Sequence, residues 1–350
     1  MNSIASTLPL MLNERLRGFG RRLADVDVAQ ATALVDRLVA DSGEEFHGLT
    51  RLAAVATQTQ IAVVTLGSAE CGAQAVVKVA ESPSAVTRLR REAGILRNLS
   101  AERRLEALRP LLPVVLAEGR MDGWTYVVQR ALPGVQGNSL FGSSHRPNVI
   151  SAAADVADLL RTKTATMAVI GPGEMDRWIW RPTQTISRAL ASRFPRVVDD
   201  LKAVAGAAEA TLLGHSLEVS WIHGDFWLGN LIFSPDGTRV TGVVDWEQAQ
   251  EGHLPLMDLF HLILYAQRLA ERRELGDVIR RVLRQGVWSD HDQRLLAHGG
   301  PVPEGRVLRA TIIAYWLGHV ASNFGQTSAY ASNKRWLRKN LLGVLREARS

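Results

Sequence analysis

The sequence predicts an α+β fold in two lobes, a small five-stranded N-terminal lobe and a larger, mainly helical C-terminal lobe. The chain has 350 residues, which is long for one ordinary domain and about right for two lobes. Short β-prone runs fill its first part, and a Leu132-Pro133-Gly134 break separates them from a region with apolar residues at helical spacing. We therefore expect an N-terminal helical extension (1–45), an N-terminal lobe (46–131) and a C-terminal lobe (132–350).

Apolar spacing and turn residues predict the individual elements. The first expected helix ends near Asp41. A second helix is expected to begin at Ser82-Pro83 and to run to Leu99. We expect strands at 52–57, 61–66, 75–79, 111–118 and 124–129, and C-terminal helices at about 150–168, 183–213, 255–273, 276–285 and 305–321. A β-hairpin of 231–233 and 240–244 interrupts the helices, across the turn Ser234-Pro235-Asp236-Gly237.

Composition excludes several function classes. The formal charge is +6, but the 41 basic residues are scattered among 35 acidic ones, which argues against a nucleic-acid partner. Cys71 is the single cysteine, so no intrachain disulfide can form, which fits a cytoplasmic protein. The N-terminus lacks the pattern of a signal peptide. The uncharged run from Ala310 to Asn333 is apolar only in its first half, so we expect no membrane span.

Three polar residues around the hairpin have the spacing that phosphoryl transfer needs. Asp225 follows His223-Gly224, Asn230 comes five residues later, and Asp245 lies across the hairpin. The reaction needs one carboxylate to accept a hydroxyl proton, and hard oxygen ligands for the divalent cations that bridge the phosphates. Asp225 can supply the first, and Asn230 with Asp245 can supply the second.

The pattern H-G-D-x-x-x-x-N followed by V-D-x-E resembles the aminoglycoside phosphotransferase family of the protein-kinase-like superfamily, over residues 45 to 330. The resemblance implies a bilobal protein-kinase-like fold with Asp225 as the catalytic residue. It implies metal ligands at Asn230 and Asp245, and it leaves Glu247 as either a second-metal or substrate contact or a solvated loop acid. It also implies that Asp258 braces the catalytic loop.

The same resemblance implies a nucleotide site in the N-terminal lobe. A buried lysine needs an anionic partner, and Lys78 in the strand Val76–Val79 is expected to pair with Glu92 and bind the α- and β-phosphates. The backbone of Arg130 and Leu132 is expected to face the purine, next to a gatekeeper at Gln129. The phosphate-covering turn has no glycine, so Thr57 and Thr59 become candidates for contacting phosphate.

These observations predict a phosphotransferase that uses ATP or GTP with Mg²⁺ and a small-molecule hydroxyl as acceptor. From residue 131 onward 25 basic residues face 21 acidic ones, which favours a neutral or anionic acceptor such as a sugar, a nucleoside or a glycosylated antibiotic. Antibiotic resistance and sugar activation both stay open. So do a protein kinase, which the short segment after Asp245 disfavours, and a non-catalytic pseudokinase. Monomer and homodimer are equally open.

Histidines and tryptophans near these motifs are expected to have structural roles. His223 is expected to hold the catalytic loop through hydrogen bonds, and His253 and His261 to be core or surface residues. The tryptophans of the same region are expected mainly to pack in the core.

Overall fold

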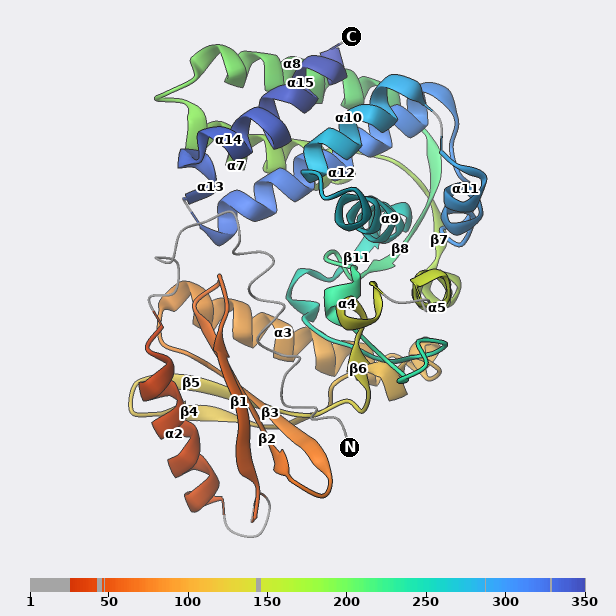
Figure 1. Cartoon of the computed structure of the whole chain (residues 1–350). Coiled ribbons are helices and arrows are strands. Elements are labelled where there is room, and N and C mark those ends of the chain that lie inside the picture. Colours follow the sequence, from red (N-terminus) through yellow and green to blue (C-terminus); the bar gives the residue numbers. More distant parts are fainter. Residues whose placement is uncertain are drawn as a thin grey trace. The chain divides into compact units, whose positions relative to one another are not determined.

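The computed structural model describes residues 26–42, 46, 48–142, 146–286, 288–327 and 329–349. Contacts divide the chain into two units (Figure 1). The first takes in the chain up to Ala153 together with Leu228–Ala249, and the second takes in Ala154–Trp227 with Gln250–Ser350. Residues 1–25 and 43–45 of the predicted N-terminal extension lie outside the described residues.

The first unit is built around an antiparallel sheet of five strands. Its elements up to Arg130 are α2 (Val28–Asp41), β1 (Thr50–Ala56), β2 (Ile61–Ser68), β3 (Gly72–Ala80), α3 (Pro83–Ala101), β4 (Val115–Met121) and β5 (Trp124–Arg130). The strand order is β1-β2-β3-β5-β4, so β1, β2 and β3 are adjacent in chain order, whereas β5 lies between β3 and β4. The predicted five-stranded sheet is confirmed.

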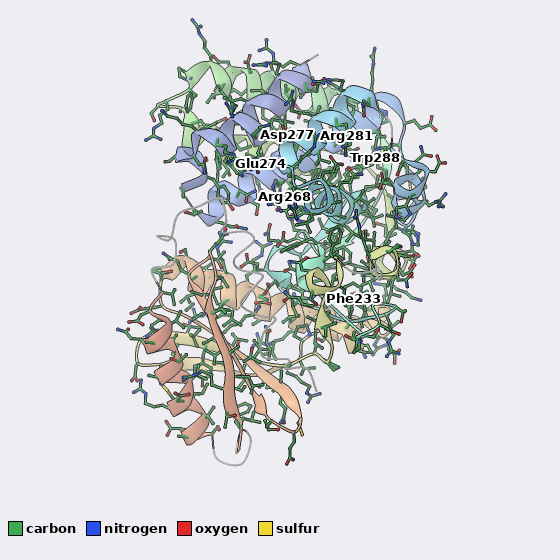
Figure 2. The ribbon with its side chains drawn as sticks, in the orientation of Figure 1. Phe233, Arg268, Glu274, Asp277, Arg281 and Trp288 are labelled. Atoms are coloured by element: carbon green, nitrogen blue, oxygen red, sulfur yellow. The ribbon has the colours of Figure 1, made fainter. Side chains whose placement is uncertain are left out.

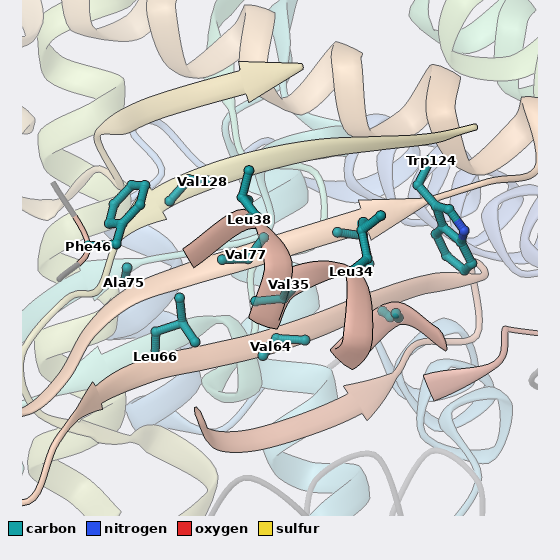
Figure 3. Close-up of a cluster of buried hydrophobic side chains, with 13 residues drawn as sticks. Leu34, Val35, Leu38, Phe46, Val64, Leu66, Ala75, Val77, Trp124 and Val128 are labelled. Atoms are coloured by element: carbon teal, nitrogen blue, oxygen red, sulfur yellow. The ribbon is translucent and has the colours of Figure 1, made fainter. Parts of the chain in front are cut away.

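Helices cover both faces of this sheet because its strands alternate apolar residues between the two sides. On one face Leu34 and Leu38 of α2 pack against Val64 and Val77 (Figure 3). On the other face α3 places buried residues against a second cluster, which comprises Ile61, Ala80, Ala85, Leu89, Ala93 and Val127. The α2 helix therefore belongs to the core of this unit.

The predicted hairpin completes the first unit. It consists of β9 (Leu231–Phe233) and β10 (Val240–Val243), paired antiparallel, and β6 (Val135–Gln136) adds a third strand beside β9. The short helix α4 (Gly137–Leu140) follows β6. Gly237 closes the turn with φ of 70°, a conformation that glycine adopts without strain.

The second unit is mainly helical, with one small sheet in the order β11-β8-β7. Its elements are α5 (Arg146–Thr164, which begins in the first unit), β7 (Thr166–Val169), α6 (Pro172–Met175), α7 (Arg181–Leu190), α8 (Pro195–Leu212), β8 (Ser216–Ile222), β11 (Gln250–His253), α9 (Leu256–Glu271), α10 (Leu275–Gln285), α11 (Asp290–Ala297), α12 (Gly305–Gln326), α13 (Ala329–Ser332), α14 (Lys334–Trp336) and α15 (Gly343–Arg349). No helix in the described ranges is long and apolar enough to cross a membrane.

The α9 helix is the centre of this unit. Every residue from Leu256 to Ala266 is buried. Phe260 stacks on Trp288 with ring centroids 5.8 Å apart, and Figure 2 labels Trp288. On α10, Asp277, which Figure 2 labels, forms an ion pair with Lys339 at 3.0 Å, and this pair connects α10 to the C-terminal segment. The α9 helix is therefore buried among other elements of the second unit.

Several predicted boundaries are wrong. The helix expected at 183–213 is two helices, because Pro195 cannot continue a helix and instead begins α8. The strand expected at 111–118 begins at Val115, after a 3₁₀ turn at Arg109–Leu111. The helix expected to end at 321 continues to Gln326. The strands β6, β7, β8 and β11 were not predicted, since each depends on pairing with a distant segment.

Candidate active site

A buried lysine joins three elements of the first unit. Lys78 lies on β3 between two valines that face α2, so its side chain points to the α3 side of the sheet. Its Nζ donates to both carboxylate oxygens of Glu92, at 2.8 and 2.9 Å, and to Asp245 Oδ1 at 2.6 Å. Burial alone would lower the pKa of Lys78, but Asp245 and Glu92 outweigh it and raise that pKa above its ordinary value. The ammonium is therefore charged, and the predicted Lys78–Glu92 pair is present.

Asp245 lies two residues after the end of β10, in the left-handed conformation with φ of 63°. A left-handed non-glycine residue is uncommon and often marks a functional site. The next residue anchors the turn, since the Trp246 indole donates to Val243 O at 2.8 Å. About half of the Asp245 side chain is exposed although it contacts the buried Lys78. Its carboxylate is thus held by Lys78 and remains half exposed.

Glu247 is held by an arginine that sequence analysis did not single out. Arg88 Nη1 donates to Glu247 Oε1 at 3.2 Å, and the Glu247 side chain is 17% exposed. Burial raises the pKa of Glu247, with Arg88 opposing that rise. Arg88 and Glu92 lie four residues apart on α3, so both meet the segment after β10. The predicted metal role of Glu247 stays a prediction, and the Arg88 contact competes with it.

Asn230 lies at the start of the hairpin and is buried. Its backbone carbonyl accepts from Val244 N at 2.9 Å, which places the residue before Asp245 beside Asn230. The Gln136 amide donates to Gly229 O, so the turn that holds Asn230 is also fixed from β6. The hairpin therefore brings together two residues that are fifteen positions apart in sequence, as the spacing predicts.

The turn between β1 and β2 forms without glycine because Gln60 adopts the left-handed conformation, with φ of 61°. Thr57 Oγ1 lies 2.8 Å from Thr59 Oγ1 and accepts from Ile61 N at 3.1 Å. The Gln60 side chain accepts from Ser82, the N-cap of α3. The two threonine hydroxyls thus bond within the turn, and their predicted phosphate contact stays a prediction.

The segment expected to face the purine is the end of β5. Arg130 N donates to Val114 O at 2.8 Å and Ala131 N donates to Gln74 O at 2.9 Å. Gln129 is buried, and its amide nitrogen has no hydrogen-bond partner among the described residues. The Leu132 side chain packs over Gly242, where a Cβ would lie within 2.5 Å of Leu132 Cδ1. The nucleotide contacts of Arg130 and Leu132 stay predictions.

In the second unit, the predicted catalytic loop is fixed by Asp258. The Asp258 carboxylate accepts from His223 N at 2.6 Å and Gly224 N at 2.8 Å. Gly224 has φ of 81°, the left-handed conformation that favours glycine. Asp225 N donates to His223 Nδ1 at 3.3 Å, in agreement with a loop-holding histidine. Burial raises the pKa of Asp258, although both backbone hydrogen bonds act to lower it.

Sequence analysis missed the contact between Asp225 and α9. His261 is buried, which matches one of the two alternatives for it, and its Nε2 lies 3.1 Å from Asp225 Oδ1. Asp258, His261 and Tyr265 follow one another at helical spacing on α9 and so share a face. That spacing, one turn after the predicted brace, is the sequence signal that could have identified His261.

Comparison with known families identifies the fold and the chemistry. The model of the phosphotransferase enzyme family matches residues 48–296, more than half of the chain. The chain belongs to this family. It is a phosphotransferase with an alcohol group as acceptor, and members of the family are kinases that bind ATP.

Solved structures confirm the bilobal kinase-like fold. Aminoglycoside phosphotransferase APH(3'')-Id from Streptomyces rimosus is 18% identical, over 83% of this chain and 97% of that one, with a TM-score of 0.51. ADP-bound APH(2'')-Ib is 15% identical, over 90% and 97%, with a TM-score of 0.55. APH(4)-Ia, solved with AMP-PNP and hygromycin B, is 17% identical, over 89% and 98%, with a TM-score of 0.52. At such identities the likeness concerns the fold alone.

Curated relatives match only a short segment. Acyl-CoA dehydrogenase family member 11 from Rattus norvegicus is 52% identical over 44 residues, which is 13% of this chain and 6% of that protein. The Homo sapiens protein of the same name is 50% identical over 48 residues, 14% of this chain and 6% of that protein. The chain thus matches a small fraction of the length of these relatives.

Proposed function

We propose that this chain transfers the γ-phosphate of ATP or GTP to a hydroxyl group of a small molecule, with Asp225 as the catalytic residue. The observation that supports it best is the buried Lys78, held at once by Glu92 and Asp245. A lysine presented by a helix glutamate and set beside a carboxylate after a hairpin suits the phosphates of a nucleotide and their metal ion.

At the phosphate end, Lys78 would bind the α- and β-phosphates while Glu92 keeps its ammonium oriented. Asn230 and Asp245 offer an amide oxygen and a half-exposed carboxylate, which are ligands that suit Mg²⁺. These two residues would hold Mg²⁺, which would supply positive charge against the negative charge that develops during transfer. Thr57 and Thr59 could turn their hydroxyls from each other to phosphate oxygens.

At the acceptor end, Asp225 would orient the hydroxyl and take its proton. The hydroxyl oxygen forms a bond to the γ-phosphorus as the bond between that phosphorus and the β,γ-bridging oxygen breaks. The nucleoside diphosphate then leaves with the electron pair. The hydrogen bonds of Asp258 to the loop before Asp225 would keep the carboxylate in place for this step.

The acceptor is proposed to be neutral or anionic. The charge balance after residue 131 is 25 basic to 21 acidic residues, which does not favour a polycation. A sugar, a nucleoside or a glycosylated natural product fits that balance. APH(4)-Ia has been solved with hygromycin B, so antibiotics belong in the test panel, and resistance is one possible outcome.

The proposal is tested by nucleotide consumption with Mg²⁺, using ATP and GTP separately against sugars, nucleosides and glycosylated antibiotics. Mass spectrometry would detect the added phosphate. Asp225→Asn should lower turnover by about 10²–10⁴-fold, the usual contribution of a general base. Asp199→Asn, an exposed aspartate on α8, is the matched control and should behave like the unmodified chain. Unchanged turnover in Asp225→Asn would overturn the assignment of Asp225.

A further inference from the structure

His261 places a buried ring nitrogen against the proposed catalytic carboxylate. Its side chain is 5% exposed, and its Nε2 lies 3.1 Å from Asp225 Oδ1. The alignment falls short of a hydrogen bond, and Nε2 has no other hydrogen-bond partner among the described residues. A buried N–H without an acceptor is costly. A small rotation of the Asp225 carboxylate would complete this one bond.

The other ring nitrogen determines which tautomer His261 adopts. His261 Nδ1 lies 3.0 Å from the Tyr315 hydroxyl. Burial raises the pKa of Tyr315 well above its ordinary value, with smaller effects from Tyr265 and Asp225 in the same direction. The hydroxyl therefore keeps its proton and can donate to Nδ1, while the carboxylate of Asp225, as the proposed base, can only accept at Nε2. A ring that accepts at Nδ1 carries its proton at Nε2, the nitrogen that faces Asp225.

Neighbouring rings fix the plane of the imidazole. Tyr265 lies 4.5 Å from His261 between ring centroids, His319 lies 5.7 Å away, and Tyr315 lies 5.9 Å away. These residues come from α9 and α12, two helices of the same unit. The titratable groups around His261 are thus Asp225, Asp258, Tyr265, Tyr315 and His319, contributed by the catalytic loop and both helices. A ring packed in this way cannot turn Nε2 away from Asp225 at low cost.

We propose that His261 is a positioning residue for phosphoryl transfer. Its Nε2–H holds Asp225 Oδ1, which fixes the rotation of the carboxylate and so the direction in which it meets the acceptor hydroxyl. Tyr315 sets the tautomer that makes this possible. The inference rests on the proposed role of Asp225. It adds two successive hydrogen bonds, from the Tyr315 hydroxyl to His261 and from the His261 N–H to Asp225, which orient the carboxylate without transferring a proton.

Two amide variants separate this role from simple packing. In His261→Gln the side-chain nitrogen can reach the place of Nε2, whereas in His261→Asn it reaches only the place of Nδ1. The assay is ATP turnover by the full chain with water as acceptor, and with any acceptor that the panel identifies. His261→Asn should lower kcat by about 10²-fold, the usual effect of a misplaced catalytic group, at an unchanged KM for ATP. His261→Gln should recover most of that loss. Equal kcat in both variants would overturn the proposal.

A second measurement does not depend on turnover. The ¹⁵N shifts of labelled histidines in the full chain distinguish the two neutral tautomers. The His261 signal should be that of the Nε2–H form, should shift in Asp225→Asn, and should lose its single tautomer in Tyr315→Phe. An Nδ1–H signal, or no response to Asp225→Asn, would refute the inference. Full turnover in Asp225→Asn together with an Nε2–H signal would instead refute the proposed role of Asp225.

Discussion

Replacing Lys78 by methionine should leave the buried carboxylate of Glu92 in the first unit without a counter-charge. Methionine has a similar length and no charge, so the change removes the ammonium with little loss of volume. Glu92 is 3% exposed, and Lys78 is its one cation within ion-pair distance among the described residues. Asp245 is half exposed and can turn to water. The variant therefore leaves Glu92 buried without a counter-charge.

The size of the stability loss follows from the difference between Glu92, which is buried, and Asp245, which is half exposed. Breaking a buried ion pair by removing one partner costs about 3–5 kcal/mol, because the remaining charge is uncompensated. Glu92→Gln should cost less, roughly 1–2 kcal/mol, since Lys78 keeps Asp245 at 2.6 Å and a glutamine oxygen can still accept. The double variant Lys78→Met, Glu92→Leu should recover most of the loss, because an apolar pair of similar volume needs no counter-charge.

Urea unfolding at pH 7, followed by far-ultraviolet circular dichroism, would measure these free energies. Hydrogen exchange of peptides from β3 and α3 would show whether the loss is local to the first unit. Lys163→Met, an exposed lysine at the end of α5, is the matched control and should change stability by less than about 0.5 kcal/mol. Two results would refute this reasoning about an uncompensated Glu92 carboxylate. In one, Lys78→Met lowers the free energy of unfolding by no more than Glu92→Gln does. In the other, the double variant is the least stable of the three.

Two further predictions concern the second unit. Burial, with a smaller effect of Arg177, lowers the pKa of His253 to about 3. Between about pH 6.5 and 3 the unfolded chain therefore binds a proton that the folded chain does not, so stability should fall on acidification, by at most about 2 kcal/mol at pH 5. His253→Gln should flatten this pH dependence of urea unfolding. Asp258→Ala should leave the amides of His223 and Gly224 without an acceptor, at roughly 1–3 kcal/mol each, and should lower ATP turnover.

A specific result would contradict each of the His253 and Asp258 predictions. An unaltered acid dependence of stability in His253→Gln would show that other groups cause it. For Asp258, the matched variant is Asp258→Asn, which keeps one acceptor oxygen. It should lie between the unmodified chain and Asp258→Ala in both stability and turnover, and equal losses in the two variants would exclude the hydrogen-bond explanation.

Local sequence signals were sufficient for the elements whose cause is local. Short β-prone runs predicted the strands of the five-stranded sheet, and Ser82-Pro83 marked the start of α3. The turn Ser234–Gly237 predicted the hairpin that brings Asn230 and Asp245 together. The wrong boundary of the helix expected at 183–213 has a local cause too, because Pro195 is itself a signal for the start of a new helix.

The candidate site divides in the same way. Spacing alone singled out Asp225, Asn230 and Asp245, because phosphoryl transfer needs a carboxylate and metal-binding oxygens at such intervals. The resemblance to the family added the pairing of Lys78 with Glu92, which fits the need of a lysine in an apolar strand for a counter-charge. Family membership then established the chemistry of an alcohol-group phosphotransferase.

The sequence by itself determined which residue types are present for the reaction, and the order of strands and helices that hold them. Only the tertiary structure decided that Lys78 contacts Asp245, 167 positions later in the chain. It likewise decided that Arg88 meets Glu247 and that His261 faces Asp225. The physical reason is that local preferences act over a few residues, whereas these contacts depend on how strands and helices far apart in sequence pack together.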